Sequence, residues 1–370
     1  MITLLRGLHF VASMSKSKAA PPGGTAVAKI PEKILLGLGN PLLDITVRVD
    51  DAFLKKYGLI ANNAIIADER HDGIFKEILD DKYEREYVAG GATQNTIRVA
   101  QWLLGRQNAT TFVGAIGADE NGKILTKKAK EVGVNVCYQI RERFKTGICA
   151  ALIHKQDRSL VTELGAATTF TDKFFDDATV WQQVEQAQFY YIGGFVFTVS
   201  EDAILKIARH STEKGKTLIM NLSAPFLCYY FKDPEISIME HIDILVGNEV
   251  EAATFAHKYG FETDDLKEIA IKAAELPKKN TKRKRTVIFT HGRHPAVVYH
   301  DGKVFEHPSL KIDPSEIKDT NGCGDSFLGG FLSQLVQGKP IEECLRCANY
   351  AASVVIKYYG CNYPEKPDFK

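Results

Sequence analysis

From residue 34 onward, short apolar runs alternate with amphipathic stretches. The runs at 34–39 and 111–116 are almost entirely apolar and are bounded by glycine or polar residues. They predict strands that are buried on both faces. Apolar positions at helical spacing follow at 70–80 and 122–132. Strands that alternate with helices in this way predict an α/β fold with a mostly parallel sheet and helices on both faces.

The same alternation returns in the second half of the chain and continues to its last helices. These segments carry the pattern expected of a doubly covered parallel sheet. Strands are predicted at 189–192, 217–221, 242–246 and 287–290, and helices at 201–212, 326–337 and 341–358.

Two segments interrupt this pattern. Residues 44–66 and 134–163 contain short alternating stretches that predict hairpins rather than strand–helix units. We expect them to pair into a small separate sheet, a lid over the carboxyl ends of the main strands, where α/β proteins bind ligands. The predicted organisation is therefore one domain at 31–370 with this lid inserted, after a disordered extension at 1–30.

Composition narrows the classes of function. The chain has 47 basic and 46 acidic side chains, so its formal net charge is only +1, and 45% of its residues are hydrophobic. A nucleic-acid-binding protein carries a basic footprint that this balance lacks, so we expect no nucleic-acid partner. No apolar run reaches the length of about 18 residues that a membrane helix needs, so we expect no membrane partner.

Cysteine usage and two charged segments bear on location. Seven scattered cysteines favour free thiols in a reducing compartment, and we expect a cytoplasmic protein. The basic run at 278–285 is either a solvated loop or a nuclear-localisation signal, so a nuclear pool is a second expectation. Residues 1–20 contain Arg6, Lys16 and Lys18 but no acid; we interpret them as a disordered extension, and a mitochondrial presequence is the alternative.

Two motifs resemble known sites but lack essential parts. Residues 117–123 match the phosphate-binding P-loop until Ile124, which stands where a hydroxyl should bind magnesium. We therefore interpret this segment as a strand-to-helix turn. Cys344 and Cys347 have the spacing of a zinc knuckle but no second pair, so they favour a structural role in a helix.

The strongest candidate for chemistry is the segment 319–330. Gly322 and Gly324 precede Asp325, which opens an amphipathic helix. Glycines and a helix N-terminus present backbone N–H groups and partial positive charge, which suits a phosphoryl group in transfer. Asp325 is placed to accept a proton from an attacking hydroxyl. The helix end should lower its pKa, but a modest base suffices when the proton leaves late. The alternative is that Asp325 only caps the helix.

A second glycine pair lies between a predicted strand and a helix. Gly90 and Gly91 permit close approach of the backbone to a ligand, and Asn95 follows one turn into the helix. Asn40 and Asp44 come directly after the first buried strand. An amide and a carboxylate at that position fit hydrogen bonding to vicinal hydroxyls. Ordinary turn chemistry explains the glycine pair equally well.

In combination with the run 248–251, Asn-Glu-Val-Glu, these signals resemble the ribokinase-type carbohydrate and nucleoside kinase family. The resemblance extends from residue 34 to the C-terminus. It implies a ribokinase-like three-layer fold with a small β-sheet lid, and a kinase that uses ATP and Mg²⁺. The runs 39–44, 93–95 and 221–226 are similar to the members that phosphorylate the 5′-hydroxyl of adenosine to give AMP.

The resemblance also implies roles for individual residues. In the expected reaction, Asp325 is the base, Arg158 reaches the transferring phosphate and Gly322, Cys323 and Gly324 form the anion hole. The other expected residues fall into three groups: Asn40, Asp44, Gly90, Gly91 and Asn95 around the ribose; Ile65, Cys149, Leu160, Phe195 and Phe226 around the purine; and Thr290, Gly292, Asn321 and Asn349 around ATP, with Asn248 and Glu251 organising magnesium.

Two other functions stay open at this point. A sugar kinase of the same family, acting on ribose or fructose, would have no use for stacking residues such as Phe195 and Phe226. A non-catalytic nucleoside-binding protein would not need Asp325, Arg158 and Glu251. We therefore expect an adenosine-phosphorylating enzyme of purine salvage, acting as a monomer.

Overall fold

The computed structural model describes residues 30–60, 63–155 and 157–370 of the 370-residue chain. The expectations about an extension at 1–30 and a presequence at 1–20 lie outside the described residues, except for Ile30. In the described part, no helix is long and apolar enough to cross a membrane.

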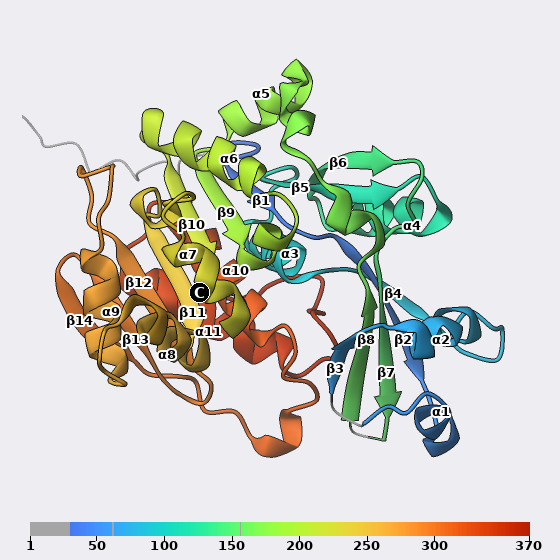
Figure 1. Ribbon diagram of the computed structural model, residues 1–370. Helices are drawn as coiled ribbons and strands as arrows, with labels where there is room; N and C mark the ends of the chain where they lie inside the picture. Colours follow the sequence, from blue (N-terminus) through green and yellow to red (C-terminus); the bar gives the residue numbers. More distant parts are fainter. Residues whose placement is uncertain (1–29, 61–62, 156) are drawn as a thin grey trace, which may run out of the picture.

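A nine-stranded sheet forms the centre of the larger part of the molecule (Figure 1). The strands from β12 to β6 pair in parallel, and the two strands beyond β12 pair antiparallel, β13 with β12 and β14 with β13. The order across the sheet is β14 (Lys303–His307), β13 (His294–His300), β12 (Thr286–His291), β11 (Ile244–Asn248), β10 (Thr217–Asn221), β9 (Phe189–Gly193), β1 (Leu35–Leu38), β5 (Thr110–Gly117) and β6 (Asn135–Arg141).

Helices cover both faces of this sheet, because its strands carry apolar side chains on both sides. In β9, for example, Tyr190 packs into one hydrophobic cluster and Tyr191 into another. The first cluster joins the sheet to α5 (Ala178–Gln186), α6 (Glu201–Glu213), α7 (Cys228–Lys232), α8 (Glu249–Tyr259) and α9 (Leu266–Glu275); the second joins it to α3 (Ala92–Leu104), α10 (Cys323–Leu335) and α11 (Ile341–Val355). The predicted three-layer α/β fold is confirmed.

A five-stranded sheet lies beside the larger one, at the lower right of Figure 1. A third hydrophobic cluster covers its back face with α1 (Asp51–Lys56), α2 (Asp72–Glu77) and α4 (Glu120–Glu131). The strand order is β3 (Ala64–Ile66), β8 (Asp157–Glu163), β7 (Ile148–His154), β2 (Leu42–Arg48) and β4 (Glu86–Gly90).

The small sheet differs from the predicted lid in its members. Residues 135–141 belong to the large sheet, where β6 pairs parallel with β5, so the expectation that all of 134–163 forms the lid is wrong. The strand β4 pairs antiparallel with β2 and completes the small sheet. The antiparallel hairpin of β7 and β8 is present as expected. The predicted helix at 70–80 is shorter, since α2 covers only Asp72–Glu77.

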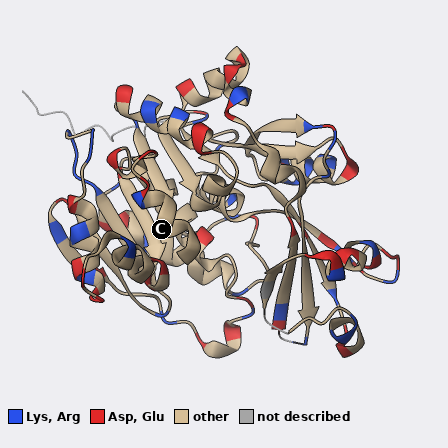
Figure 2. Cartoon of the chain, in the orientation of Figure 1, with Lys and Arg blue, Asp and Glu red and all other residues tan. Residues whose placement is uncertain are grey.

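The basic run at 278–285 is neither a fully solvated loop nor a free basic segment. Lys278 and Arg283 both contact the buried carboxylate of Asp243 at 2.7 Å. Arg285 is fully buried and donates to backbone carbonyls, among them those of Ile242 and Ala273. This segment therefore anchors the start of β12, and the nuclear pool stays a prediction. In the view of Figure 2, basic and acidic residues are mixed over the outer helices.

We expect Asp243→Ala to lower the free energy of unfolding by about 3–5 kcal/mol, because it leaves two cations beside a buried site without their counter-charge. Urea denaturation measures this. Asp176→Ala, which removes an exposed ion pair with Lys206, is the control and should cost less than about 1 kcal/mol. Equal effects of the two substitutions would contradict the anchoring role of Asp243.

Candidate active site

Helix α10 begins with backbone N–H groups that no side chain satisfies. Its N-cap is Gly322, which has φ of 79° and no side chain to offer. Among the described residues, the amides of Gly324 and Asp325 meet no hydrogen-bond acceptor. A methyl group at Gly324 would contact nothing within 4 Å, so the space in front of these amides is open. Unpaired amides at the positive end of a helix form a site for an anion.

The carboxylate of Asp325 lies beside these amides but does not cap the helix. Its Oδ2 accepts a hydrogen bond from Nδ2 of Asn95 at 3.0 Å, and no described group donates to Oδ1. Burial raises the pKa of Asp325 to about 7, against the hydrogen bond from Asn95, which lowers it. The pKa of Asp325 is thus shifted upward by burial, opposite to the downward shift expected from the helix end. A carboxyl group with a pKa near neutrality is suited to accept a proton.

Asp44 projects from β2 toward the same region. Its carboxylate lies against Gly90, where any Cβ would come within 2.2 Å of Oδ1. Gly91 has φ of 92°, and a Cβ there would lie 2.2 Å from the carbonyl oxygen of Asn40. The glycine pair is thus required for the close packing of Asn40, Asp44 and the start of α3. Burial raises the pKa of Asp44 to about 6, while Arg158 and then Arg98 lower it.

Arg158 joins the small sheet to the segment before α10. Its Nη1 contacts Oδ2 of Asp319 at 2.9 Å, and its Nη2 lies 4.0 Å from Oδ2 of Asp44. Arg158 and Asp319 are both almost completely buried. The residue expected to reach a transferring phosphate is therefore present at the site, but in this state its guanidinium is bound to Asp319, a role that the sequence analysis did not assign.

The residues expected around the purine are only partly brought together. Cys149 and Asp44 are register partners, and Leu160 projects from the same face of the small sheet. Ile65 is paired with Val161 and packs into the cluster on the back face. Its assignment to the purine pocket is wrong, because side chains alternate between the faces of a strand. Its neighbour Ile66, which is 63% exposed, occupies the ligand-facing side.

Phe195 and Phe226 come from two loops at the carboxyl ends of β9 and β10. Their ring centroids lie 6.4 Å apart, and the rings are 37% and 59% exposed. The loops are joined by a hydrogen bond from the amide of Gly194 to Oγ of Ser223 at 2.8 Å. Two exposed aromatic rings held at this separation offer an apolar wall for a flat ligand.

The residues expected around ATP lie along the next strands. Asn248 and Thr290 are register partners at the ends of β11 and β12. Asn248 and Glu251 form a reciprocal cap on α8, in which the amide of Asn248 donates to Glu251 at 2.9 Å. The other three stand on separate elements: Gly292 in the turn after β12 with φ of 54°, Asn321 bonded to Asp319, and Asn349 on α11 bonded to the carbonyl of Pro308.

Tyr191 is a buried residue that the sequence analysis missed. Burial raises the pKa of its hydroxyl, and the charges of Asp325 and Glu251 raise it further. The hydroxyl of Tyr191 is therefore near enough to both Asp325 and Glu251 to sense their charges. The strand pattern identified Tyr191 as core, and nothing in the sequence distinguishes it from other core aromatic residues.

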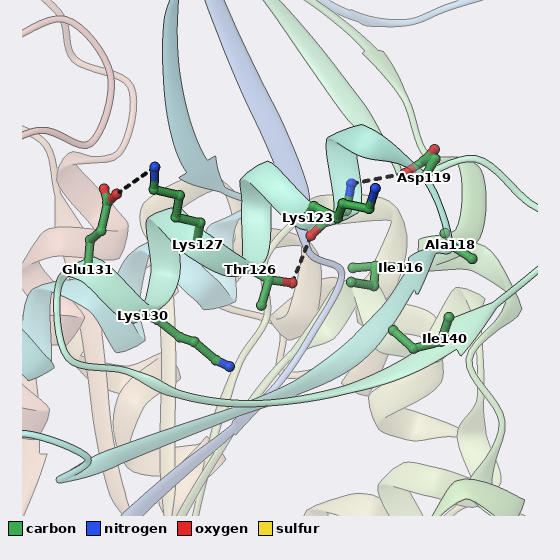
Figure 3. Close-up of a pocket in the computed structure, with 11 residues that line it drawn as sticks. Ile116, Ala118, Asp119, Lys123, Thr126, Lys127, Lys130, Glu131 and Ile140 are labelled. Carbon is green, nitrogen blue, oxygen red and sulfur yellow. Dashed lines mark hydrogen bonds and ion pairs between the residues drawn. The ribbon is translucent and has the colours of Figure 1, made fainter.

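The segment that resembles a P-loop forms a turn, as expected. Asp119 accepts from the amide of Gly122 at 2.9 Å and from the hydroxyl of Thr146 at 2.6 Å. The amide that a P-loop would offer to phosphate is thus already bonded. Lys123 and Lys127 line an open cavity beside this turn, which Figure 3 shows.

Cys344 and Cys347 are buried in α11, where Cys347 packs against Ser333 of α10.

The fold and this site together define a small-molecule kinase, with an anion site at a helix N-terminus and a carboxylate beside it. The chain belongs to the pfkB carbohydrate kinase family, whose model matches residues 51–368. The expected family resemblance and the ribokinase-like fold are confirmed.

Individual relatives are similar over nearly the whole chain. Adenosine kinase 1 of Arabidopsis thaliana is 47% identical over 336 residues, which cover 91% of this chain and 97% of the relative. Adenosine kinase of Dictyostelium discoideum is 39% identical, with 89% and 96% covered. The crystal structure of Anopheles gambiae adenosine kinase with P1,P4-di(adenosine-5) tetraphosphate has a TM-score of 0.82 at 42% identity and covers 92% of this chain and 100% of that one. The structure of Schistosoma mansoni adenosine kinase with 2-fluoroadenosine has a TM-score of 0.81 at 36% identity, with 90% and 98% covered.

We expect Asp325→Asn to lower kcat for phosphoryl transfer by about 10²–10⁴-fold, because an amide cannot accept the proton of the attacking hydroxyl. The melting temperature should not change. In the unsubstituted enzyme, kcat/KM should fall as the pH falls through about 7, since only the deprotonated Asp325 acts as base.

Asp177→Asn is the matched control, because Asp177 caps α5 and lies outside the site. Its rate should equal that of the unsubstituted enzyme. A rate for Asp325→Asn within about threefold of that value, well short of the loss of a base, would show that Asp325 is not the proton acceptor.

Proposed function

We propose that this protein is an adenosine kinase, which transfers the γ-phosphoryl group of ATP to the 5′-hydroxyl of adenosine and yields AMP and ADP. The observation that carries the proposal is the meeting of Asp44, Asn95 and Asp325 in front of the open N-terminus of α10. The similarity to adenosine kinases over 91% of the chain supports the choice of acceptor.

The proposed ribose site consists of Asp44, Asn40 and Asn95. A carboxylate accepts hydrogen bonds from two vicinal hydroxyls, and such charge-assisted bonds are stronger than neutral ones. The Oδ1 atom of Asn95 is buried and has no partner among the described residues. An unpaired buried acceptor costs free energy, and a ligand hydroxyl that donates to it recovers that cost.

The proposed chemical step uses the other end of the ligand. With the ribose held by Asp44, the 5′-hydroxyl lies beside Asp325, whose Oδ1 is free to take its proton. Nδ2 of Asn95 holds the other carboxylate oxygen and fixes the direction of the first. The amides of Gly324 and Asp325 stabilise the charge of the phosphoryl group in transfer, because they are already oriented before the reaction.

The residues at the end of β11 fit a magnesium ion held largely through water. Glu251 supplies one carboxylate and Asn248 one amide, and burial raises the pKa of Glu251, so that a nearby cation would favour its ionised form. Magnesium keeps several waters and is bound through one or two carboxylates and the phosphates of its nucleotide. Bound there, it would neutralise charge on the phosphates. Among the described residues, no group of three or more His, Cys, Asp or Glu could hold a metal alone.

A sugar kinase of the same family is the alternative function. The pair Phe195 and Phe226, together with the exposed Ile66, favours a purine, because a free sugar has no flat apolar face to cover.

We further propose that the protein is a monomer, since α1, α2 and α4 of the same chain cover the back of the small sheet. The cytoplasmic location stays a prediction.

We expect ATP-dependent phosphorylation of adenosine, with inosine, ribose and fructose turned over far more slowly. The reason is that only a purine nucleoside would both cover the apolar wall of Phe195 and Phe226 and bind the carboxylate of Asp44. A screen of these acceptors with ATP, read by AMP and ADP formation, measures this. Turnover of a free sugar equal to that of adenosine would reject the nucleoside assignment.

We expect Asp44→Ala to weaken the binding of adenosine by about 2–4 kcal/mol, since two charge-assisted hydrogen bonds are lost. The binding of ATP should change little, and calorimetry with each ligand measures both. Glu84→Ala, which removes an exposed acid before β4, serves as the control and should bind both ligands normally. Lost ATP binding with unchanged adenosine binding would mean that the two sites are assigned in reverse.

A further inference from the structure

Arg98, on α3, is a buried guanidinium for which the proposed reaction has no use. Its side chain is only 5% exposed. Nη1 donates to the carbonyl of Cys361 at 3.3 Å, and Nε has no hydrogen-bond partner among the described residues. The ring of Tyr363 lies 5.5 Å from Cζ. Within the described residues, no carboxylate lies close enough to form an ion pair with it. A buried charge without a partner is costly, so its retention calls for a reason.

The location of Arg98 relates it to Asp44. Asp44 and Val88 are paired across β2 and β4, so their side chains project from the same face of the small sheet. Arg98 lines one cavity together with Val88 and Thr46, the neighbours of Asp44 across and along the strands. The positive charge of Arg98 lowers the pKa of Asp44, opposing the burial that raises it.

The other groups that face Asp44 do not replace Arg98. Arg158, from β8, lowers the pKa of Asp44 more than Arg98 does. It is shared between two carboxylates, however, because it lies 2.9 Å from Asp319 and 4.0 Å from Asp44. Cys149, from β7, is neutral, since burial raises the pKa of its thiol to about 12, and the same holds for Cys361. Asp325, from α10, offers no positive charge, and the charge of Asp44 raises the pKa of Asp325.

Arg98 is held in one position, whereas Arg158 is expected to move. Helix α3 and the C-terminal segment hold it on both sides, through Cys361 and through the hydroxyl of Tyr363, which donates to the carbonyl of Arg98 at 3.2 Å. Arg158 stands on the β7–β8 hairpin, and the proposed reaction requires it to turn toward phosphate. When Arg158 does so, Arg98 is the cation that stays beside Asp44.

We propose that Arg98 is a positioning residue for the acceptor nucleoside, which keeps Asp44 ionised so that its carboxylate binds the ribose hydroxyls. The inference rests on the proposed function, since it concerns the same adenosine site. Arg98 touches neither substrate and acts on binding through Asp44, so its loss should change the affinity for adenosine and leave the chemical step unchanged.

The test is the dissociation constant of adenosine, measured by calorimetry without ATP, for Arg98→Gln between about pH 5.5 and pH 8.5. Glutamine is neutral and still able to donate to Cys361. An opposite charge typically shifts a pKa by about one unit or more, so binding should weaken about tenfold near pH 5.5, where Asp44 becomes protonated, and by much less near pH 8.5. The KM for ATP should not change, and the kcat at saturating adenosine should not change near pH 8.5, where Asp44 and Asp325 are both ionised.

Three variants complete the experiment. Arg98→Lys keeps the charge and should restore the pH profile of the unsubstituted protein, and Arg98→Met is a second neutral variant in case the first does not fold. Arg106→Met removes a cation just after α3 that pairs with Glu32, and it should behave as the unsubstituted protein. A neutral variant that binds adenosine normally near pH 5.5, or equally weakly at both pH values, overturns the role of Arg98. Failure of the unsubstituted protein to bind adenosine would instead overturn the proposed function, and the inference with it.

Discussion

The site depends on one buried carboxylate, that of Asp319. It accepts four hydrogen bonds: from the amide and from Nδ2 of Asn321, from the amide of Gly360 and from Nη1 of Arg158. Those donors belong to the loop before α10, to the C-terminal segment and to the small sheet. Asp319 therefore fixes the start of α10, the position of the C-terminal segment and the contact between the small sheet and the large one. Removing such a carboxylate would leave several buried donors unpaired, and each costs about 1–3 kcal/mol.

Burial has the largest effect on the pKa values of the two other carboxylates of the site, Asp44 and Asp325. Burial raises the pKa of Asp44 to about 6 and that of Asp325 to about 7, although cations face the first and a helix N-terminus faces the second. Each carboxylate has a different set of partners, and this difference separates their roles. The one with cations beside it stays ionised and suits binding, and the one with only Asn95 beside it is free to exchange a proton.

The fold could be predicted from sequence because its information is local. Fully buried strands such as β1 and β5 are rich in apolar residues, and α10 and α11 show helical spacing, so their type follows from periodicity. The errors arose where pairing decided the outcome. Residues 135–141 have the same alternation whether they pair with β5 or with a lid strand. Ile65 and Ile66 are both apolar, and only the register with β8 determines which of them faces the ligand.

The candidate site was predictable to the extent that glycine and turn chemistry mark it. Gly90, Gly91 and Gly322 are required by close approach or by positive φ, and a sequence shows such requirements as glycines beside a predicted helix. The effect of burial on the pKa of Asp325 could not be predicted from the sequence, because burial is a property of the whole fold.

The contacts of Arg158 show why a further cation is needed at Asp44. A single guanidinium stands between two carboxylates, closer to Asp319 than to Asp44. Asp319 accepts hydrogen bonds from three other donors, all neutral amides, but Asp44 has no hydrogen-bond donor among the described residues, and Asp325 adds a like charge nearby. If Arg158 turns toward an incoming phosphate, its attraction for Asp44 weakens just when the ribose must be held. The positive charge of Arg98, which α3 holds in place, then keeps the Asp44 carboxylate ionised. Adenosine binding therefore persists while Arg158 moves.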